Sequence, residues 1–264
     1  MIEAFYNLNS LPFGKNISPD KIFLSASAAE LRKRLEYMLS KRGLFLITGL
    51  PGTGKTLNVR AFISSLNPNL FKPFYIPLAT VSTMEFHQQL CSCLTGEIFW
   101  RKNQNFKAIQ LSIKDYVQNQ KKVPIIIFDE AHFLKNENFY ELQIISNIEM
   151  DSLQPALFII ISQPHLRERL LRPIHQAFYQ RIDMHFVLTP LARDESSAYI
   201  AHQLSLSGRD DPIFDSAALK AIFQNSGGIP RMINKICIKS LTIGALEKKE
   251  TLSAEEVFRS TREL

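Results

Sequence analysis

Residues 44–56 read LFLITGLPGTGKT, an apolar run followed at once by a glycine-rich segment. The run Leu44–Thr48 predicts a buried strand, and residues 56–65 predict a helix. Between them, residues 49–56 match the pattern GxxxxGK[ST], in which the backbone N–H groups of the loop surround phosphate oxygens. We expect Lys55 to reach the β- and γ-phosphates and Thr56 to bind Mg²⁺. The candidate cofactor-binding residues of this loop are Gly49, Pro51, Gly52, Thr53, Gly54, Lys55, Thr56 and Leu57.

A second apolar run, Ile125–Phe128, ends in the paired acids Asp129 and Glu130. A buried strand would carry both carboxylates to the carboxyl edge of a parallel sheet, beside the phosphate loop. We expect Asp129 to hold Mg²⁺, directly or through water, and Glu130 to polarise an attacking water. The letters DEAH at 129–132 also occur in RNA helicases. Those proteins need two such domains, and this chain has room for one. We therefore expect His132 to begin a helix rather than to take part in catalysis.

A third apolar run, Leu157–Ile161, predicts the fourth strand and ends in the uncharged polar residues Ser162 and Gln163. Either side chain is a candidate for hydrogen bonding to the attacking water or to the γ-phosphate. The alternative is that both residues only open the turn at Pro164.

The order of apolar runs and amphipathic stretches predicts alternating strands and helices, as in a parallel sheet covered on both faces. Further strands are expected at 74–79 and 184–188, and further helices at 28–40, 82–94, 139–149 and 166–172. Beyond Pro190 the strand pattern stops, and short helices are expected at 194–205, 216–224, 230–246 and 253–261. We therefore predict a nucleotide-binding β/α domain at 1–190 and a helical lid domain at 191–264.

Two arginines are candidate catalytic residues. Arg181 precedes the fifth predicted strand, where it could be presented to the nucleotide of a neighbouring subunit. Arg167, Arg169 and Arg172 compete for that role. Arg231 lies in the segment GGIPR, residues 227–231, where a Gly-Gly turn and a proline open a helix of the predicted lid. An arginine at that position can contact the nucleotide and couple the lid to its γ-phosphate.

The composition excludes a disordered or a fibrous chain. Apolar residues make up 45% and charged residues 21% of the 264 residues, a balance typical of globular proteins. The longest apolar runs are far shorter than the ~20 residues that cross a bilayer, and we see no signal peptide. The three cysteines match no zinc pattern and indicate a reducing cytoplasm. The net charge of +6 is compatible with nucleic acid but does not require it.

Together these motifs resemble AAA+ ATPases: a phosphate loop, a strand ending in Asp-Glu, a polar-tipped fourth strand, an arginine acting in trans and a helical lid. More narrowly, the chain is similar to the secretion-pathway protein A-like group, which includes ATPases encoded beside transposases. The narrower resemblance rests on FYNL (5–8) with Pro12-Phe13, on NIE (147–149) with Asp151-Ser152, and on QPHLR (163–167). It also rests on TPL (189–191) and SGGIPRMIN (226–234).

The resemblance implies an α/β fold with a five-stranded parallel sheet in the order 5-1-4-3-2. It also implies that the fourth strand points at the γ-phosphate and that Pro12 and Phe13 pack near the adenine. One departure is Leu57 in place of a second threonine, which we expect to be harmless. Secretion-type members continue into a membrane segment and a wall-binding domain that do not follow here. We therefore expect a member of the transposon-associated kind.

The stretch 93–122, between the second and third predicted strands, is expected to be irregular. It combines Phe99 and Trp100 with cations, a mixture that suits nucleic-acid backbones and bases. In transposition ATPases that resemble this chain, the corresponding region follows the DNA backbone. The candidate DNA-binding residues are Arg101, Lys102 and Lys107. The alternative is a solvated loop with Trp100 in the core.

The sequence thus predicts an ATPase that binds ATP and Mg²⁺ at subunit interfaces and forms a ring or helical oligomer on double-stranded DNA, largely independent of base sequence. We expect it to be cytoplasmic and to recruit or regulate a transposase. Two alternatives are a secretion-linked ATPase acting on an envelope protein complex, and an ATP-sensing switch with little turnover.

Overall fold

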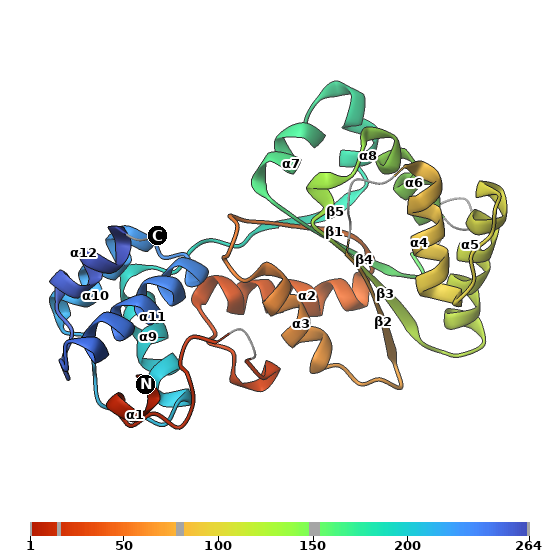
Figure 1. The fold of residues 1–264 in the computed structure, drawn as a ribbon. Helices are drawn as coiled ribbons and strands as arrows, with labels where there is room; N and C mark the ends of the chain where they lie inside the picture. Colours follow the sequence, from red (N-terminus) through yellow and green to blue (C-terminus); the bar gives the residue numbers. More distant parts are fainter. Residues whose placement is uncertain (1, 15–16, 78–81, 148–153, 263–264) are drawn as a thin grey trace. The chain divides into compact units, whose positions relative to one another are not determined.

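The computed structural model describes residues 2–14, 17–77, 82–147 and 154–262 (Figure 1). The chain forms two compact units. The larger comprises residues 30–49 and 55–188, and the smaller comprises residues 1–29, 50–54 and 189–264. The last boundary along the chain lies between Leu188 and Thr189, and the N-terminal 29 residues belong with the C-terminal helices. The division into domains 1–190 and 191–264 stays a prediction.

The larger unit is built on a five-stranded sheet with the order β2-β3-β4-β1-β5. Its strands are β1 (Gly43–Thr48), β2 (Phe71–Pro77), β3 (Val123–Asp129), β4 (Leu157–Ser162) and β5 (Ile182–Val187). Each pair is parallel, and Gly43 lies opposite Leu157 while Thr48 lies opposite Ser162. The expected strand order is confirmed. The ends of β1, β3 and β4 therefore meet at one carboxyl edge, which places their polar residues together.

Helices cover both faces of this sheet, so the larger unit has three layers. Alternate residues of β3 divide between the faces: Ile126 and Phe128 pack into one core, and Ile125 and Ile127 into the other. The first face carries α4 (Thr83–Thr95), α5 (Lys102–Gln118), α6 (Asn136–Ser146), α7 (Pro164–Leu170) and α8 (Gln176–Tyr179). The second face carries α2 (Ala26–Lys41) and α3 (Lys55–Ser64). Two short 3-10 helices, η2 (Ala131–Phe133) and η3 (Pro173–His175), join these elements.

The expectation that residues 93–122 are irregular is wrong. Helix α4 continues to Thr95, and α5 occupies 17 residues of the stretch. The missed signal is an apolar face at helical spacing, on which Ile109 and Ile113 are fully buried and Phe106 is half-buried. Trp100 precedes this helix with 94% of its surface exposed, so its placement in a core is wrong as well.

The smaller unit contains α1 (Ile2–Tyr6), η1 (Pro19–Lys21), α9 (Arg193–Leu206), α10 (Ser216–Ser226), α11 (Pro230–Leu246) and α12 (Ala254–Arg262). These elements enclose one apolar core, to which α1 contributes Tyr6 and α11 contributes Ile233, Ile236 and Leu241. Glu256 accepts hydrogen bonds from the backbone N–H and hydroxyl of Ser253, and α12 begins one residue after the predicted start, at Ala254.

Two sequence expectations extend beyond the described residues. The predicted strand 74–79 and helix 139–149 run into residues 78–81 and 148–153, and the resemblance at Asp151-Ser152 lies there too. Among the helices that the structure describes, none combines the length and the apolar character that a membrane crossing requires.

Candidate phosphate-binding site

The glycine-rich segment is a turn between β1 and α3. Gly52 and Gly54 have φ angles of +85° and +93°, which side-chain-bearing residues rarely adopt. Lys55 is the first residue of α3, and its ammonium donates a hydrogen bond to the carbonyl oxygen of Gly49 over 2.8 Å. The Thr53 hydroxyl donates to the carbonyl oxygen of Leu50. The segment therefore presents backbone and ammonium donors at a helix N-terminus, the arrangement that binds phosphate.

Thr56 and Asp129 lie in contact at the carboxyl edge of the sheet. The Thr56 hydroxyl donates to Oδ2 of Asp129 over 2.8 Å, and the Tyr75 hydroxyl donates to the same oxygen over 2.9 Å. Burial, followed by the hydrogen bond to Asp129, raises the pKa of Tyr75 to about 12, so this hydroxyl remains a donor at neutral pH. A hydroxyl and a carboxylate are hard oxygen ligands of the kind that Mg²⁺ prefers.

Glu130 follows Asp129 in a strained backbone conformation. Its φ angle of +54° is left-handed, and its N–H donates to Oδ1 of Asp129 over 2.9 Å. About half of its side chain, 54%, is exposed. The two carboxylates are therefore oriented differently, with Asp129 buried among donors and Glu130 open to solvent.

Ser162 and Gln163 lie at the end of β4, beside Thr48 of β1. The buried Ser162 hydroxyl donates to the carbonyl oxygen of Gln163, its own neighbour. The Gln163 side chain instead contacts the ring of His132, with 3.2 Å between the two Nε2 atoms. Gln163 thus lies with the Glu130 segment, whereas Ser162 bonds within its own turn.

The four candidate trans arginines differ in their surroundings. Arg169 is held inside its own subunit, because its guanidinium donates to the carbonyl oxygens of His132 and Leu134 and lies over the Phe139 ring. These contacts argue against its presentation to another subunit.

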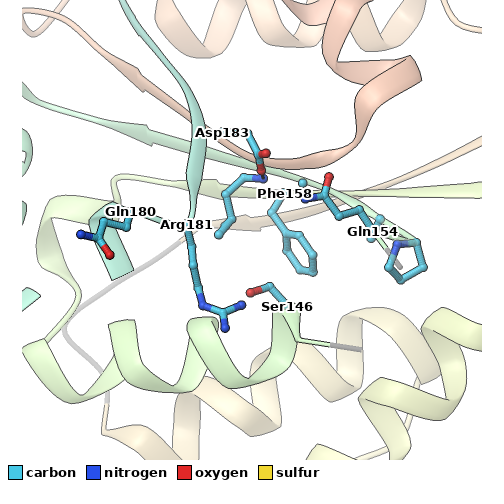
Figure 2. Close-up of a pocket in the computed structure, with 10 residues that line it drawn as sticks. Ser146, Gln154, Phe158, Gln180, Arg181 and Asp183 are labelled. Atoms are coloured by element: carbon cyan, nitrogen blue, oxygen red, sulfur yellow. Dashed lines mark hydrogen bonds between the residues drawn. The ribbon is translucent and has the colours of Figure 1, made fainter. Parts of the chain in front are cut away.

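Arg181 lies at the amino edge of the sheet, opposite Thr56 and Asp129. It borders a pocket of about 220 Å³ that also includes Gly43, Ala156 and Asp183, residues at the starts of β1, β4 and β5. Figure 2 shows its guanidinium directed toward Ser146 at the end of α6. Since parallel strands separate the two edges, Arg181 would have to come from another copy to reach a nucleotide.

Arg231 contacts the phosphate loop within the smaller unit. Its backbone N–H lies 3.3 Å from the carbonyl oxygen of Gly52, and a Cβ atom added to Gly52 would lie 2.7 Å from the Cβ of Arg231. Pro12 and Phe13 are buried, and Phe13 packs in the core of this unit with Leu191 and Tyr199. Leu57, in α3, is half-buried.

The candidate DNA-binding residues belong to the start of α5. Arg101 is its N-cap residue, and both Arg101 and Lys107 are exposed. Lys102 forms an ion pair with Glu141, which also bonds Nε2 of the buried His87 over 2.8 Å. Burial lowers the pKa of His87 despite this carboxylate. The Lys102 charge is therefore already compensated by α6, which makes it the weakest of the three candidates.

Comparison with known proteins identifies the family of the chain. The model of a protein family described as AAA domain matches residues 37–170, the segment that contains the phosphate loop, the Asp-Glu pair and Gln163. The chain belongs to the AAA domain family. This AAA domain protein is 29% identical over 245 residues to the General secretion pathway protein A of Aeromonas hydrophila. The match covers 91% of the present chain but only 44% of that relative.

Solved structures share the fold of this AAA domain protein at low sequence identity. The ORC of Drosophila, solved bound to DNA, aligns with a TM-score of 0.70 at 16% identity, covering 98% of the present chain and 64% of that chain. Cdc6p of Pyrobaculum aerophilum also gives 0.70 at 13% identity, covering 99% and 70%. RuvB of Thermotoga maritima gives 0.57 at 17% identity, covering 98% and 73%. The likeness is one of AAA+ fold.

Sequence reasoning missed two residues of this site. Tyr75 gave no signal, because one aromatic residue on an apolar strand is ordinarily a packing residue. His132 was expected only to begin a helix, yet its ring contacts Gln163 and its Nδ1 lies 3.4 Å from Oε2 of Glu130. Its position two residues after the candidate base was the available signal.

Proposed function

We propose that this AAA domain protein binds ATP with Mg²⁺ and hydrolyses it to ADP and phosphate. The observation that carries the proposal is the 2.8 Å hydrogen bond between Thr56 and Asp129, which joins the phosphate-loop helix to the Asp-Glu strand. Membership of the AAA domain family supports it as well.

The donor set fits a nucleoside triphosphate and its metal ion. The N–H groups of residues 49–54 and the Lys55 ammonium would hold the β- and γ-phosphates, and Thr56 and Asp129 would hold Mg²⁺. The metal, when bound, neutralises phosphate charge. Pro12, Phe13, Pro51 and Leu57 remain our proposed contacts to the rest of the nucleotide.

Hydrolysis would be in-line attack of water on the γ-phosphate, achieved mainly by positioning and charge stabilisation. Glu130, whose carboxylate is half exposed, would orient the water, and Gln163 or Ser162 would bond the water or the γ-phosphate. Arg231 would contact the nucleotide, as its bond to Gly52 suggests. Arg181 would act in trans, which makes an oligomer necessary for full activity.

We propose a secretion-linked assembly as the target of this ATPase. The support is the similarity over 91% of the chain to a protein named for general secretion. The motifs alone favoured a DNA-bound partner of a transposase, and this similarity makes the secretion-linked target our first choice instead. Because the chain corresponds to less than half of that relative, the point at which this sequence ends does not decide between the two kinds of member.

DNA-dependent assembly with a transposase is the second candidate. It is favoured by the exposed Trp100 beside Arg101 at the start of α5, a pairing that suits stacking and phosphate contact. An ATP-sensing switch with little turnover is the third.

Phosphate release from the purified chain, measured with ATP and Mg²⁺, tests the proposal. The assay is run alone, with duplex DNA, and with Lys55→Ala as a blank. Turnover above that blank supports the ATPase, and turnover equal to it refutes it. Stimulation by DNA, lost at raised salt, would move the preference from the secretion-linked target to the DNA-bound oligomer.

A further inference from the structure

His132 bridges two side chains that come from different strands. It lies in η2, directly after Glu130, and only 6% of its side chain is exposed. Its Nε2 lies 3.2 Å from Nε2 of Gln163, at the end of β4. Its Nδ1 lies 3.4 Å from Oε2 of Glu130, at the end of β3. One buried ring thus faces both the candidate base and the candidate sensor of the γ-phosphate.

The hydrogen-bond partners determine which ring nitrogen of His132 carries the proton. The amide nitrogen of Gln163 can only donate, so Nε2 of His132 accepts. A neutral imidazole then has its proton on Nδ1, the atom that faces Glu130. Within the described part of the chain this Nδ1 is buried without a hydrogen-bond partner of good geometry. A small rotation of the exposed Glu130 carboxylate would complete that bond.

Helix α7, which follows Gln163, also holds the backbone around His132. Arg169 of α7 donates to the carbonyl oxygens of His132 and Leu134, over 3.3 and 2.7 Å. The ring of His165, also on α7, lies edge-on to His132 with 5.0 Å between centroids. Helix α7 therefore supports the segment that directly follows Glu130, the residue with the left-handed φ angle.

Burial, more than the charges that face His132, favours the neutral ring. Burial lowers its pKa; Glu130 opposes this, whereas His165, Lys55 and Arg169 add to the lowering. These groups come from its own turn, from α7 and from α3. At neutral pH the ring therefore offers one N–H and one acceptor, as the bridge requires.

We propose that His132 is a positioning residue that aligns the Glu130 carboxylate through Nδ1–H and is itself oriented by Gln163. The inference rests on the proposed ATP hydrolysis. It makes the orientation of the base depend on what Gln163 contacts, so that the sensor and the base are coupled through one ring.

Three variants separate the two halves of the bridge. His132→Phe keeps the ring volume and removes both polar contacts. His132→Asn places an amide near the position of Nδ1 and can still donate to Glu130, whereas His132→Gln reaches the position of Nε2 and serves only Gln163. The matched control is His175→Phe, because His175 is also a buried histidine and bonds Asn136, not Gln163, through Nε2.

We expect kcat of the full chain to fall about tenfold or more in His132→Phe and His132→Gln, with KM for ATP changed less than about twofold. His132→Asn should recover kcat to within about threefold of the parent. In a Glu130→Gln background His132→Phe should cause no further loss, because both act through one group. Parental kcat in His132→Phe, or His132→Gln exceeding His132→Asn, would overturn the inference. Should His132→Phe not fold, the order of the Asn and Gln variants decides.

A second readout does not depend on turnover. Nitrogen-15 NMR of the histidine rings should show His132 as the Nδ1–H tautomer, and Gln163→Ala should shift its Nε2 signal but not that of His175. An Nε2–H tautomer, or no response to Gln163→Ala, contradicts the bridge. If the parent protein releases no phosphate, the proposed function fails. The spectra still test the contacts of His132 with Glu130 and Gln163 independently of turnover.

Discussion

The hydroxyl of Thr56 donates a hydrogen bond to Oδ2 of Asp129, although the two residues are 73 positions apart in the sequence. Tyr75 of β2 donates to the same oxygen. Two donors on one carboxylate oxygen hold Asp129 in one orientation, and they differ in their expected roles. Thr56 is a proposed Mg²⁺ ligand, whereas Tyr75 only orients the carboxylate.

Thr56→Val is expected to raise the Mg²⁺ concentration needed for half-maximal ATPase activity about tenfold, because a ligand is lost. Tyr75→Phe should raise it less than about threefold, because Asp129 keeps the Thr56 bond. A Mg²⁺ titration of phosphate release compares them. Equal effects of the two substitutions would show that Thr56 is not a ligand.

Lys55→Ala is expected to weaken ATP binding at least about 100-fold, since a charge-assisted contact to phosphate is lost. Calorimetric titration with a non-hydrolysable analogue measures this. Lys33→Ala, at an exposed position of α2, is the matched control and should bind as the parent does. Normal binding by Lys55→Ala would rule out the phosphate role of the loop.

Glu130→Gln is expected to lower turnover about 100-fold or more while ATP binding persists, because the amide cannot act as a base. ATP-bound oligomers should accumulate, which light scattering after size exclusion measures. Glu137→Gln, on the exposed first turn of α6, should have parental turnover. Parental turnover in Glu130→Gln would show that the base is another group.

Gly228→Ala is expected to destabilise the smaller unit by about 3–5 kcal/mol. The φ angle of Gly228 is +72°, and an added Cβ would lie 2.1 Å from the carbonyl oxygen of Leu191. Gly227→Ala is the neighbouring control: its φ is +58°, but the added Cβ meets nothing within 4 Å, so only about 1 kcal/mol is expected. Urea denaturation monitored by circular dichroism compares them, and equal losses would contradict the steric argument.

Acid should weaken the smaller unit through Glu256. Burial by itself would raise the pKa of this carboxyl, but hydrogen bonds from Lys249 and Ser253 outweigh burial and lower it to about 2. Because the folded pKa lies below the ordinary value of 4.5, the stabilisation is present above pH 4.5 and is lost as the pH falls toward 2. The free energy of unfolding should therefore fall less over this range in Glu256→Gln than in the parent. Glu255→Gln, exposed in the same turn, should follow the parent, and identical slopes in all three would refute the assignment.

Much of the larger unit follows from local pattern. Each of the five strands was predicted near its observed position, because buried parallel strands are nearly continuous apolar runs, as in Ile125–Phe128. The strand order came from family resemblance, since the apolar runs alone do not specify their neighbours. Helix α5 was not predicted because its many polar and charged residues mask the apolar face formed by Ile109 and Ile113.

The sequence by itself determined the phosphate-binding turn and the acid pair, because both depend on residue types at short, fixed spacing beside apolar runs. Only the tertiary structure decided which groups surround them. The Tyr75 bond to Asp129 and the His132 contacts to Glu130 and Gln163 join different strands or turns. Such contacts depend on strand order, register and the direction of each side chain, which no local pattern encodes.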